Sequence, residues 1–383
     1  MAKLGDIFVL QMGKTPARAN NKYWNNGDNP WVSISDLSNY GKYVGKTKET
    51  ISNLAVAESG IKAAPANTVI MSFKLTLGKT AITVMPTYTN EAIMAFVPKG
   101  NYPVYPSYFY HFFSGRDWSK GTNRAVMGTT LNKATLNEID IAIPSFDDQV
   151  KIAELLDKLD SIVSLRKQQL SKLDELVKSR FIELFGNNDY PTEPLDNNVI
   201  EMFIGPFGSS LKNEVFVDEE DGFCMVYEQK HAIQKTMDVP TRYVPQRKYV
   251  ELKRFTILGG DIIVSCRGTI GEIFIVPDDA PMGIMHPSIM KIRLNTEKYN
   301  QKFFVFALEQ YMVEHNAEAK GSGVKMAVSA TVLGQSDFVV PPMKMQNRFA
   351  TFVEQVDKSK LAIQKSLEKL EILKKSLMQK YFG

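Results

Sequence analysis

Residues 144–186 read PSFDDQVKIAELLDKLDSIVSLRKQQLSKLDELVKSRFIELFG, and residues 341–383 read PPMKMQNRFATFVEQVDKSKLAIQKSLEKLEILKKSLMQKYFG. The two stretches align without a gap at a constant offset of 197 residues, which places Gln149 on Gln346. Neither has a proline after its opening, and the only glycine in each is its last residue. Because proline and glycine disfavour a helix interior, each stretch is predicted to form one long, uninterrupted α-helix.

A seam of apolar residues runs along both stretches. The apolar positions alternate between spacings of four and three residues, which is the heptad pattern of a coiled coil. Arg166 and Arg180 break the first seam, whereas Lys360 and Lys374 break the second. We therefore expect the two helices to pair with each other, with the polar breaks of one copy opposite apolar positions of the other. Helices that only mediate oligomerisation are the alternative. The predicted seam consists of Leu156, Leu159, Val163, Leu170, Leu173, Val177, Val353, Val356, Ile363, Leu367, Leu370 and Leu377.

The rest of the chain forms two globular parts with a loosely repeated plan. In each part a predicted strand ends in Ser-x-basic-x-Thr-x-Gly, at residues 72–78 and 265–271, and an aromatic helix follows. The predicted fold class is α+β. Two globular mixed α/β domains are separated by a pair of long helices that form an antiparallel intramolecular coiled coil, with a pseudo-two-fold internal repeat. The predicted parts are a domain at 1–143, a helix at 144–186, a domain at 187–340 and a helix at 341–383.

Local patterns predict the elements within the globular parts. Alternation of apolar and small polar residues predicts a strand at 30–37, and apolar runs predict strands at 68–73 and 81–85. Aromatic clusters predict the two helices at 105–113 and 303–311. Three further segments are predicted to be loops: the Asn-rich segment 20–28, the Gly-, Thr- and Asn-containing segment 121–130, and the glycine-rich segment 321–325.

The composition is that of a multidomain protein with more than one core, since 383 residues contain 44% hydrophobic residues. No apolar run approaches the length of about 18 residues that a membrane helix needs, and the start lacks the apolar core of a signal peptide. We expect a cytoplasmic protein without a membrane partner. Cys224 and Cys266 have no Cys or His partner at metal spacing, so neither a disulfide framework nor a metal site is predicted.

Catalytic motifs are missing from the sequence. Residues 41–47 resemble a phosphate-binding loop, but the spacing between their glycines is one residue too short. No Gly-x-Gly-x-x-Gly follows a strand, and no Gly-x-Ser-x-Gly turn occurs. A methyltransferase would also need a glycine-rich cofactor turn and an Asn-Pro-Pro-aromatic loop, and neither is present. The chain is therefore predicted not to be an enzyme and to hold no cofactor of its own.

Charge is distributed unevenly along the chain. The net charge is +6 for residues 1–143, −1 for 144–186, −6 for 187–340 and +5 for 341–383. A positive surface favours contact with nucleic acid, so charge alone makes the first domain and the last helix candidates for it. The second domain is acidic overall, although residues 242–254 include a local cluster of basic side chains.

The order of these features resembles the specificity subunit of type I restriction-modification systems over essentially the whole chain. The residues that carry the resemblance are Gly13-Lys14-Thr15-Pro16, Tyr23-Trp24, Trp31 to Asp36, the strand ends at Ser72 and Ser265, and the helix openings at 143–149 and 340–346. Each is a weak signal alone. Their order, which occurs twice and is followed each time by a long helix, is highly specific.

The resemblance implies two target-recognition domains, at 1–143 and 187–340, each of which reads one half of a bipartite site in double-stranded DNA. It implies that the two helices form an antiparallel spacer on which modification (methyltransferase) subunits dock, two per chain, and to which restriction subunits can be added. S-adenosylmethionine and ATP with Mg²⁺ would then be bound by those partners. The assembled complex would be a DNA adenine methyltransferase and an ATP-dependent endonuclease.

With this resemblance, the polar turns become candidate DNA contacts, because Lys, Arg, Ser and Thr bind phosphates and paired donors read base edges. The candidates for phosphate contact are Lys14, Thr15, Ser209, Ser210 and Lys212. The candidates for groove contact follow the matching strands: Lys74, Thr76, Lys79, Arg267 and Thr269. The late glycine-rich segments add Arg124 and Lys325. For each residue, a plain surface turn or a loop packed on its own domain is the alternative.

Two other functions fit the same sequence. One is a coiled-coil scaffold whose globular ends bind protein. The other is the specificity subunit of a restriction-methylation enzyme outside the type I class. The scaffold would show no affinity for DNA, and the identity of a co-purifying methyltransferase would distinguish the two classes of specificity subunit.

Overall fold

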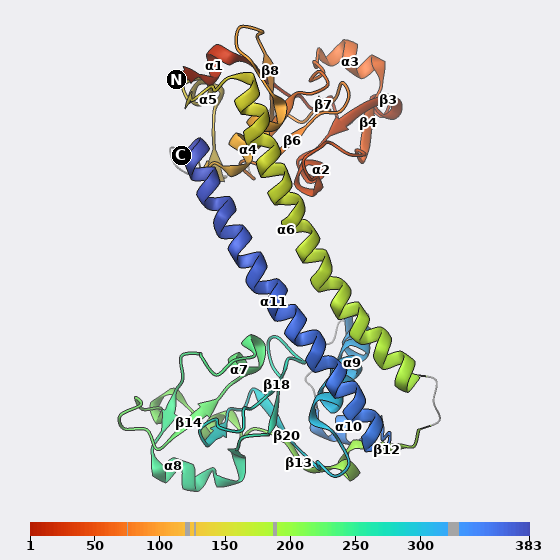
Figure 1. Ribbon diagram of the computed structural model, residues 1–383, viewed down its shortest axis with the longest axis vertical. Helices are drawn as coiled ribbons and strands as arrows, with labels where there is room; N and C mark the ends of the chain where they lie inside the picture. The colour runs from red at the N-terminus through yellow and green to blue at the C-terminus, as the bar shows by residue number, and fades with distance from the viewer. Residues whose placement is uncertain (75, 119–122, 126–127, 187–189, 321–328) are drawn as a thin grey trace. The chain divides into compact units, whose positions relative to one another are not determined.

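The computed structural model describes residues 1–74, 76–118, 123–125, 128–186, 190–320 and 329–383 (Figure 1). The chain forms two compact units. Unit 1 contains residues 1–169 and 363–383, and unit 2 contains residues 170–362. Each unit therefore consists of one globular part, one half of the first long helix and one half of the second.

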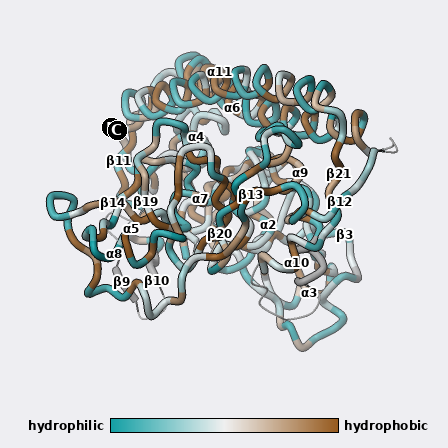
Figure 2. The backbone as a smooth tube through the Cα atoms, turned by 90° about the horizontal axis from the view of Figure 1, so that it is seen from below, coloured by the Kyte–Doolittle hydropathy of each residue, from teal (hydrophilic) through white to brown (hydrophobic). Residues whose placement is uncertain are grey.

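Both long stretches of the repeat are helical, as predicted. The first is α6 (Phe146–Phe181), which continues as the π-helical segment η1 (Ile182–Gly186), and the second is α11 (Met343–Phe382). Ser145 begins α6 as an N-cap, because its hydroxyl accepts a hydrogen bond from the Asp148 amide at 3.2 Å and donates to the Asp148 carboxylate at 2.7 Å. Brown and teal turns alternate along both helices in Figure 2, as expected for helices with one apolar face.

The globular part of unit 1 is built on two small sheets. One is antiparallel in the order β2-β8-β5-β6, and the other has the order β4-β3-β7, with β3 and β7 parallel. The strands of unit 1 are β1 Ala2–Lys3, β2 Phe8–Met12, β3 Trp24–Val32, β4 Glu49–Ile51, β5 Val69–Ser72, β6 Thr80–Ile82, β7 Tyr88–Thr89, β8 Ile93–Pro98, β9 Asn123–Ala125, β10 Gly128–Thr130 and β11 Asp140–Ile141. Its short helices are α1 Leu4–Ile7, α2 Ile34–Asn39, α3 Asn53–Ser59, α4 Pro106–Gly115 and α5 Lys133–Asn137.

The globular part of unit 2 repeats this plan. Its first sheet has the order β13-β20-β17-β18, and its second has the order β15-β14-β19-β16, with β14 and β19 parallel. The strands are β12 Thr192–Pro194, β13 Val199–Ile204, β14 Cys224–Tyr227, β15 Tyr243–Val244, β16 Thr256–Ile257, β17 Ile262–Ser265, β18 Ile273–Ile275, β19 Gly283–Met285, β20 Ile289–Leu294 and β21 Asp337–Val339. The helices are η2 Leu195–Asn198, η3 Gly208–Ser210, η4 Asn213–Val215, α7 Gln229–Gln234, α8 Gln246–Glu251, η5 Lys253–Phe255, α9 Gln301–Lys320 and α10 Ala330–Gln335.

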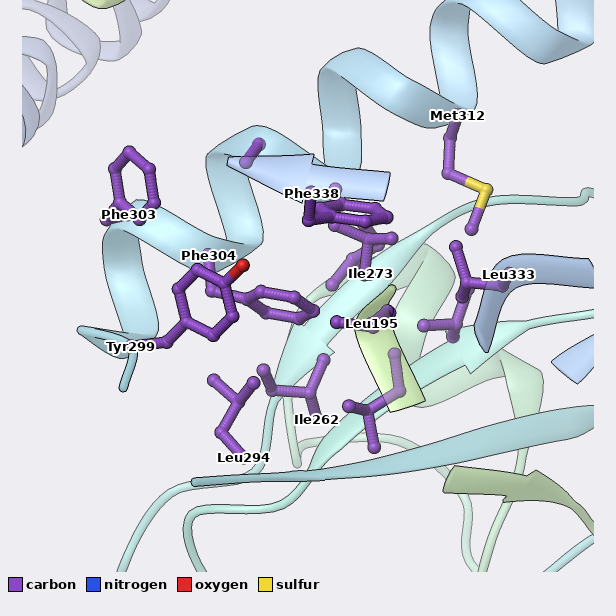
Figure 3. Packing of buried hydrophobic residues seen from close by; sticks show 14 of the residues in the cluster. Leu195, Ile262, Ile273, Leu294, Tyr299, Phe303, Phe304, Met312, Leu333 and Phe338 are labelled. Atoms are coloured by element: carbon purple, nitrogen blue, oxygen red, sulfur yellow. The ribbon is translucent and has the colours of Figure 1, made fainter. Parts of the chain in front are cut away.

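An aromatic helix packs on the first sheet of each unit. In unit 1, α4 places Phe109 edge-on against Phe8 of β2, with ring centroids 4.9 Å apart. In unit 2, Phe303 and Phe304 of α9 are fully buried and lie in the same cluster as Ile262 of β17 (Figure 3). Burial of such large rings supplies much of the hydrophobic driving force for each domain.

The long helices begin and end on these aromatic helices. In unit 1, Phe382 at the end of α11 lies 5.1 Å from the ring of Tyr108 in α4. In unit 2, Phe185 at the end of the first repeat lies 4.8 Å from the ring of Phe303 in α9. Phe185 and Phe382 occupy the same position of the repeat, so the two units use one packing arrangement twice.

A fully buried glutamine fixes the start of each long helix to its globular part. Gln149 accepts a hydrogen bond from the Tyr105 amide at 2.9 Å and donates to the carbonyls of Pro103 and Pro144 at 3.0 and 3.1 Å. The equivalent residue, Gln346, accepts from the Asn300 amide at 2.8 Å. It donates to the carbonyls of Lys298 and Pro341 at 2.9 and 2.8 Å.

Within each unit the two helices run antiparallel. In unit 1, Lys374 pairs with Asp160, and Lys167 lies 3.4 Å from Glu371. The contacts thus move toward the start of α11 as they move toward the end of α6. In unit 2, Lys360 pairs with Asp174, while Phe349 lies 5.4 Å from the ring of Phe181. Every predicted seam residue is buried or partly buried.

The prediction that the polar breaks face apolar positions is wrong for the two lysines. Lys360 and Lys374 instead face the carboxylates of Asp174 and Asp160. An ammonium group in a seam that is only partly shielded is stabilised by an acidic partner, which the other helix supplies at matching register.

Several local predictions need correction. The predicted strand at 30–37 ends at Val32, because Ser33 and Asp36 form a capping box that starts α2. The predicted loop at 20–28 contains the beginning of β3, and the predicted strand at 81–85 ends at Ile82. Within the predicted loop at 121–130, the described residues form the hairpin β9-β10.

Candidate nucleic-acid interface

The Ser-x-basic-x-Thr-x-Gly motif forms the same turn in both units. In unit 1 the Ser72 amide donates to the Lys79 carbonyl at 2.8 Å, and the Lys79 amide donates to the Ser72 hydroxyl at 3.0 Å. In unit 2 the Ser265 amide donates to the Glu272 carbonyl at 2.9 Å, and the Glu272 amide donates to the Ser265 hydroxyl at 2.9 Å. Both serines are fully buried, so they hold the turn together.

The glycine that ends this motif has a backbone reason to be there. Gly78 and Gly271 have φ values of 79° and 87°, in the left-handed region that side chains disfavour. The Ser and Gly of the motif therefore form a structural frame that presents the residues between them. Thr76, Arg267 and Thr269 are exposed, as is Lys79 directly after Gly78, whereas Lys74 is half-buried with its ammonium 5.2 Å from the Phe73 ring.

The early turns also occupy equivalent places. The Gly13 amide donates to the Ile93 carbonyl at 3.0 Å, and the Gly205 amide donates to the Ile289 carbonyl at 3.0 Å. Lys14 donates to the Ser59 carbonyl, and Thr15 donates to the Glu91 carboxylate, so both side chains are engaged within their own domain.

The early turn of unit 2 is more open. Ser209 and Lys212 are exposed and Ser210 is half-buried; both serines lie in η3. The neighbouring Phe207 is 87% exposed, which is unusual for a large apolar side chain.

The structure brings the early turn and the serine turn together. In unit 1, the Lys14 amide donates to the Thr89 carbonyl at 2.8 Å, and the Phe73 amide donates to the Ala92 carbonyl at 3.0 Å. In unit 2, the Gly205 amide donates to the Ile289 carbonyl at 3.0 Å, and the Cys266 amide donates to the Ser288 carbonyl at 2.8 Å. Both sets of predicted contact residues thus flank one segment in each unit, 89–93 or 286–289.

The remaining two candidates are placed differently. Arg124 lies in β9, where its Cα is in register with Thr129 of β10. Lys325 lies outside the described residues.

A buried polar cluster in unit 2 escaped prediction from the sequence. Glu228, which is 8% exposed, forms ion pairs with Arg242 and with Lys230, the latter at 2.7 Å. Burial opposes ionisation of Glu228, but hydrogen bonds from Arg242 and Lys230 outweigh it and hold the pKa of this carboxyl below its usual value. The Arg242 guanidinium also lies 3.8 Å from the Phe216 ring centroid.

Two imidazoles lie beside this cluster. The Glu228 amide donates to Nδ1 of His231 at 3.0 Å, and His286 Nδ1 lies 2.8 Å from the Ser288 hydroxyl. Burial is the main cause that lowers the pKa of both histidines. No sequence motif marks Glu228 or His286, because they follow short strands that are far apart in the chain.

In unit 1 a charged junction joins the globular part to α6. His111, which is 1% exposed, places Nε2 2.8 Å from Asp157, and Lys42 pairs with the same carboxylate. Burial lowers the pKa of His111, and its hydrogen bond with Asp157 acts in the opposite direction. The junction fixes the helix relative to the sheet edge of its own unit.

No group of three or more His, Cys, Asp or Glu side chains suited to a metal ion occurs among the described residues. Cys224 and Cys266 are buried free thiols, and burial raises their pKa values to about 11 and about 12. Over the ranges that the structure describes, the helices are too short or too polar to cross a bilayer.

The sequence matches the model of the type I restriction modification DNA specificity domain over residues 1–175 and 230–374. The type I restriction enzyme MjaIX specificity subunit of Methanocaldococcus jannaschii is 30% identical over 217 residues, which cover 56% of this chain and 48% of that protein. The EcoR124I/EcoR124II specificity subunit of Escherichia coli is 27% identical over 187 residues, 46% of this chain and 45% of that protein. The alignments span about half the length of these relatives.

Solved structures share the fold. A chain from a study of complex assembly and conformational transition of the type I R-M system superposes with a TM-score of 0.64 at 16% identity, and the alignment covers 100% of this chain and 96% of that one. The S subunit of a type I restriction-modification system from M. genitalium gives a TM-score of 0.54 at 14% identity, with 100% and 95% covered. Since the specificity-domain model covers most of the sequence, in two regions that match its internal repeat, this chain belongs to the family of type I restriction-modification specificity subunits.

Proposed function

We propose that the chain is the non-catalytic DNA-recognition subunit of a type I restriction-modification complex, and that each globular part reads one half of a bipartite site in double-stranded DNA. The observation that carries this proposal is the double use of one scaffold. The same strands, serine turn and early turn occur in both units, but the exposed side chains at equivalent places differ. Two domains with the same backbone arrangement but different exposed side chains are suited to bind the two different halves of one DNA site.

The long helices are proposed to act as the spacer between the two readers. α6 and α11 pass from one unit to the other without a break in the helix. At 1.5 Å per residue, a helix of 36 residues is about 54 Å long, which exceeds one turn of duplex DNA at about 34 to 36 Å. A rigid spacer of fixed length would select a fixed gap between the half-sites.

Partner subunits are proposed to dock on the outer faces of these helices. Apolar side chains off the seam are exposed there, including Ile162 and Leu165 on α6 and Ile372 on α11, at 42%, 55% and 69%. Such side chains favour a protein partner. We propose two modification subunits per chain, to which restriction subunits can be added, with S-adenosylmethionine, ATP and Mg²⁺ held by those partners. The proposed location is the cytoplasm.

Co-expression with a modification subunit tests this function. Sequencing of host DNA for methylated adenines should show a bipartite motif with a fixed gap, and removal of one heptad from each helix should change that gap. A chain that yields no new methylation would favour the scaffold function instead. Methylation with an unaltered gap after heptad removal would refute the spacer.

A further inference from the structure

Three strand ends converge at one edge of unit 2. β14 and β19 are parallel neighbours, so the residues after them emerge at the same edge of their sheet. The hydrogen bond from the Cys266 amide to the Ser288 carbonyl brings the end of β17 to this edge as well. His286 directly follows β19, and Gln229 and Arg267 lie two residues after the ends of β14 and β17.

Two observations place these residues close together. A Cβ atom built on Gly268, directly after Arg267, would lie 3.7 Å from the side-chain amide nitrogen of Gln229. Arg267 is also among the positive charges that help to lower the pKa of His286, after the larger influence of burial. Residues that are at least 19 positions apart in sequence therefore form one surface.

The hydrogen-bonding groups on this surface are incompletely used. Oε1 of Gln229 is buried and has no hydrogen-bond partner among the described residues. Arg267 is exposed, and within the described ranges no carboxylate forms an ion pair with it. A buried acceptor without a partner is costly, so a rotation of the Gln229 side chain that pairs Oε1 with a donor from outside the chain would be stabilising.

The equivalent edge of unit 1 carries different chemistry. β3 and β7 are parallel there, and the places of Gln229, His286 and Arg267 are taken by Ile34, Asn90 and Lys74. Asn90 uses its amide internally, because Nδ2 donates to the Thr15 hydroxyl at 3.2 Å and Oδ1 accepts from the Ala92 amide at 2.8 Å. The two edges thus share a backbone and differ in the groups that they offer to a ligand.

We propose that Gln229 and Arg267 are specificity-determining residues of unit 2, an inference that rests on the proposed DNA-recognition function. Gln229 offers one donor and one acceptor, which match N7 and the N6 amino group of adenine, and Arg267 offers paired donors, which match O6 and N7 of guanine. The half-site that unit 2 reads therefore contains an A·T pair and a G·C pair that these two neighbouring side chains recognise. The Glu228 cluster positions the start of α7, from which Gln229 projects.

Methylome sequencing of cells that express the full chain with its modification subunit tests the assignment. Arg267→Ala should relax one guanine position of the motif, and Gln229→Ala one adenine position in the same half. Discrimination at each position should fall on the order of 10- to 100-fold, while the gap and the other half stay unchanged. Arg247→Gln is the matched control, since Arg247 is an exposed arginine on α8 of the same unit, and it should leave the motif intact.

The outcomes separate the two proposals. If Arg267→Ala weakens methylation of all sites equally and the motif stays intact, Arg267 contacts a phosphate and its assignment is overturned, although the DNA-recognition function stands. An unchanged motif in both variants also overturns the inference. If the wild-type complex produces no motif at all, the proposed function itself fails. Melting temperatures of the variants, expected to match the wild type, exclude loss of folding as the cause, and Gln229→Asn provides a milder second variant.

Discussion

Replacement of Gln149 by leucine should destabilise unit 1 without disturbing its surface. The Gln149 side chain is fully buried and makes three hydrogen bonds, to the amide of Tyr105 and to the carbonyls of Pro103 and Pro144. At about 1 kcal/mol for each hydrogen bond, and with partial compensation from the added apolar surface, the expected loss is about 2–3 kcal/mol. For a unit of this size, the melting temperature should fall by roughly 5–10 °C.

The repeat supplies an internal comparison for this prediction. Gln346 makes the matching three hydrogen bonds in unit 2, at 2.8 to 2.9 Å, so Gln346→Leu should cost a similar free energy. Gln168, which is exposed on α6, gives the control Gln168→Ala, and its effect should stay within about 0.5 kcal/mol. Denaturant unfolding of the full chain measures each difference.

A charged variant sharpens the test. Gln149→Glu keeps the acceptor for the Tyr105 amide but turns a carboxylate toward two carbonyl oxygens. Burial and these oxygens would raise the pKa of the new carboxyl above its unfolded value, so the variant should be weakest at neutral pH and recover partly as the pH falls toward 5. If Gln149→Leu unfolds within 0.5 kcal/mol of the wild type, the glutamine does not fasten the helix, and the reasoning is refuted.

Three further results are expected. Because burial lowers the pKa values of His111, His231 and His286, the native state should lose stability as the pH falls below about 6.5, the pKa of histidine in the unfolded chain. Thermal melts from pH 7.5 to 5.5 measure this loss. An equal loss in a variant without the three imidazoles would contradict the prediction. Gly271→Ala should cost about 1–2 kcal/mol in denaturant unfolding, since φ at this position is 87°, whereas no measurable cost would mean that the turn relaxes. The affinity of the assembled complex for DNA should fall steeply with salt in a log-log titration, and a flat dependence would argue against phosphate contacts.

The sequence by itself determined the elements whose signals are local or repeated. The two helices, their seam and the internal repeat follow from heptad spacing and from a gapless alignment of two stretches, and neither depends on distant residues. The serine turn was visible for the same reason, because Ser, Thr and Gly recur in one short window in both halves. The strand at 30–37 was wrong beyond Val32 because a capping box overrode the alternation of apolar residues.

Only the tertiary structure decided which groups meet. Gln149 and Gln346 aligned in the repeat, but their burial and hydrogen bonds depend on loops more than 40 residues away. Lys374 pairs with Asp160 because of the register between two antiparallel helices, and that register cannot be read from either helix alone. Gln229 lies beside the turn at Arg267 and Gly268 because β14 pairs with β19, and because the Cys266 amide donates to the Ser288 carbonyl shortly after β19. Periodicity is a property of residues that are close in sequence, whereas a surface formed by distant segments depends on long-range contacts. The sequence therefore predicted the helices and the repeat, and only the fold shows which side chains lie together.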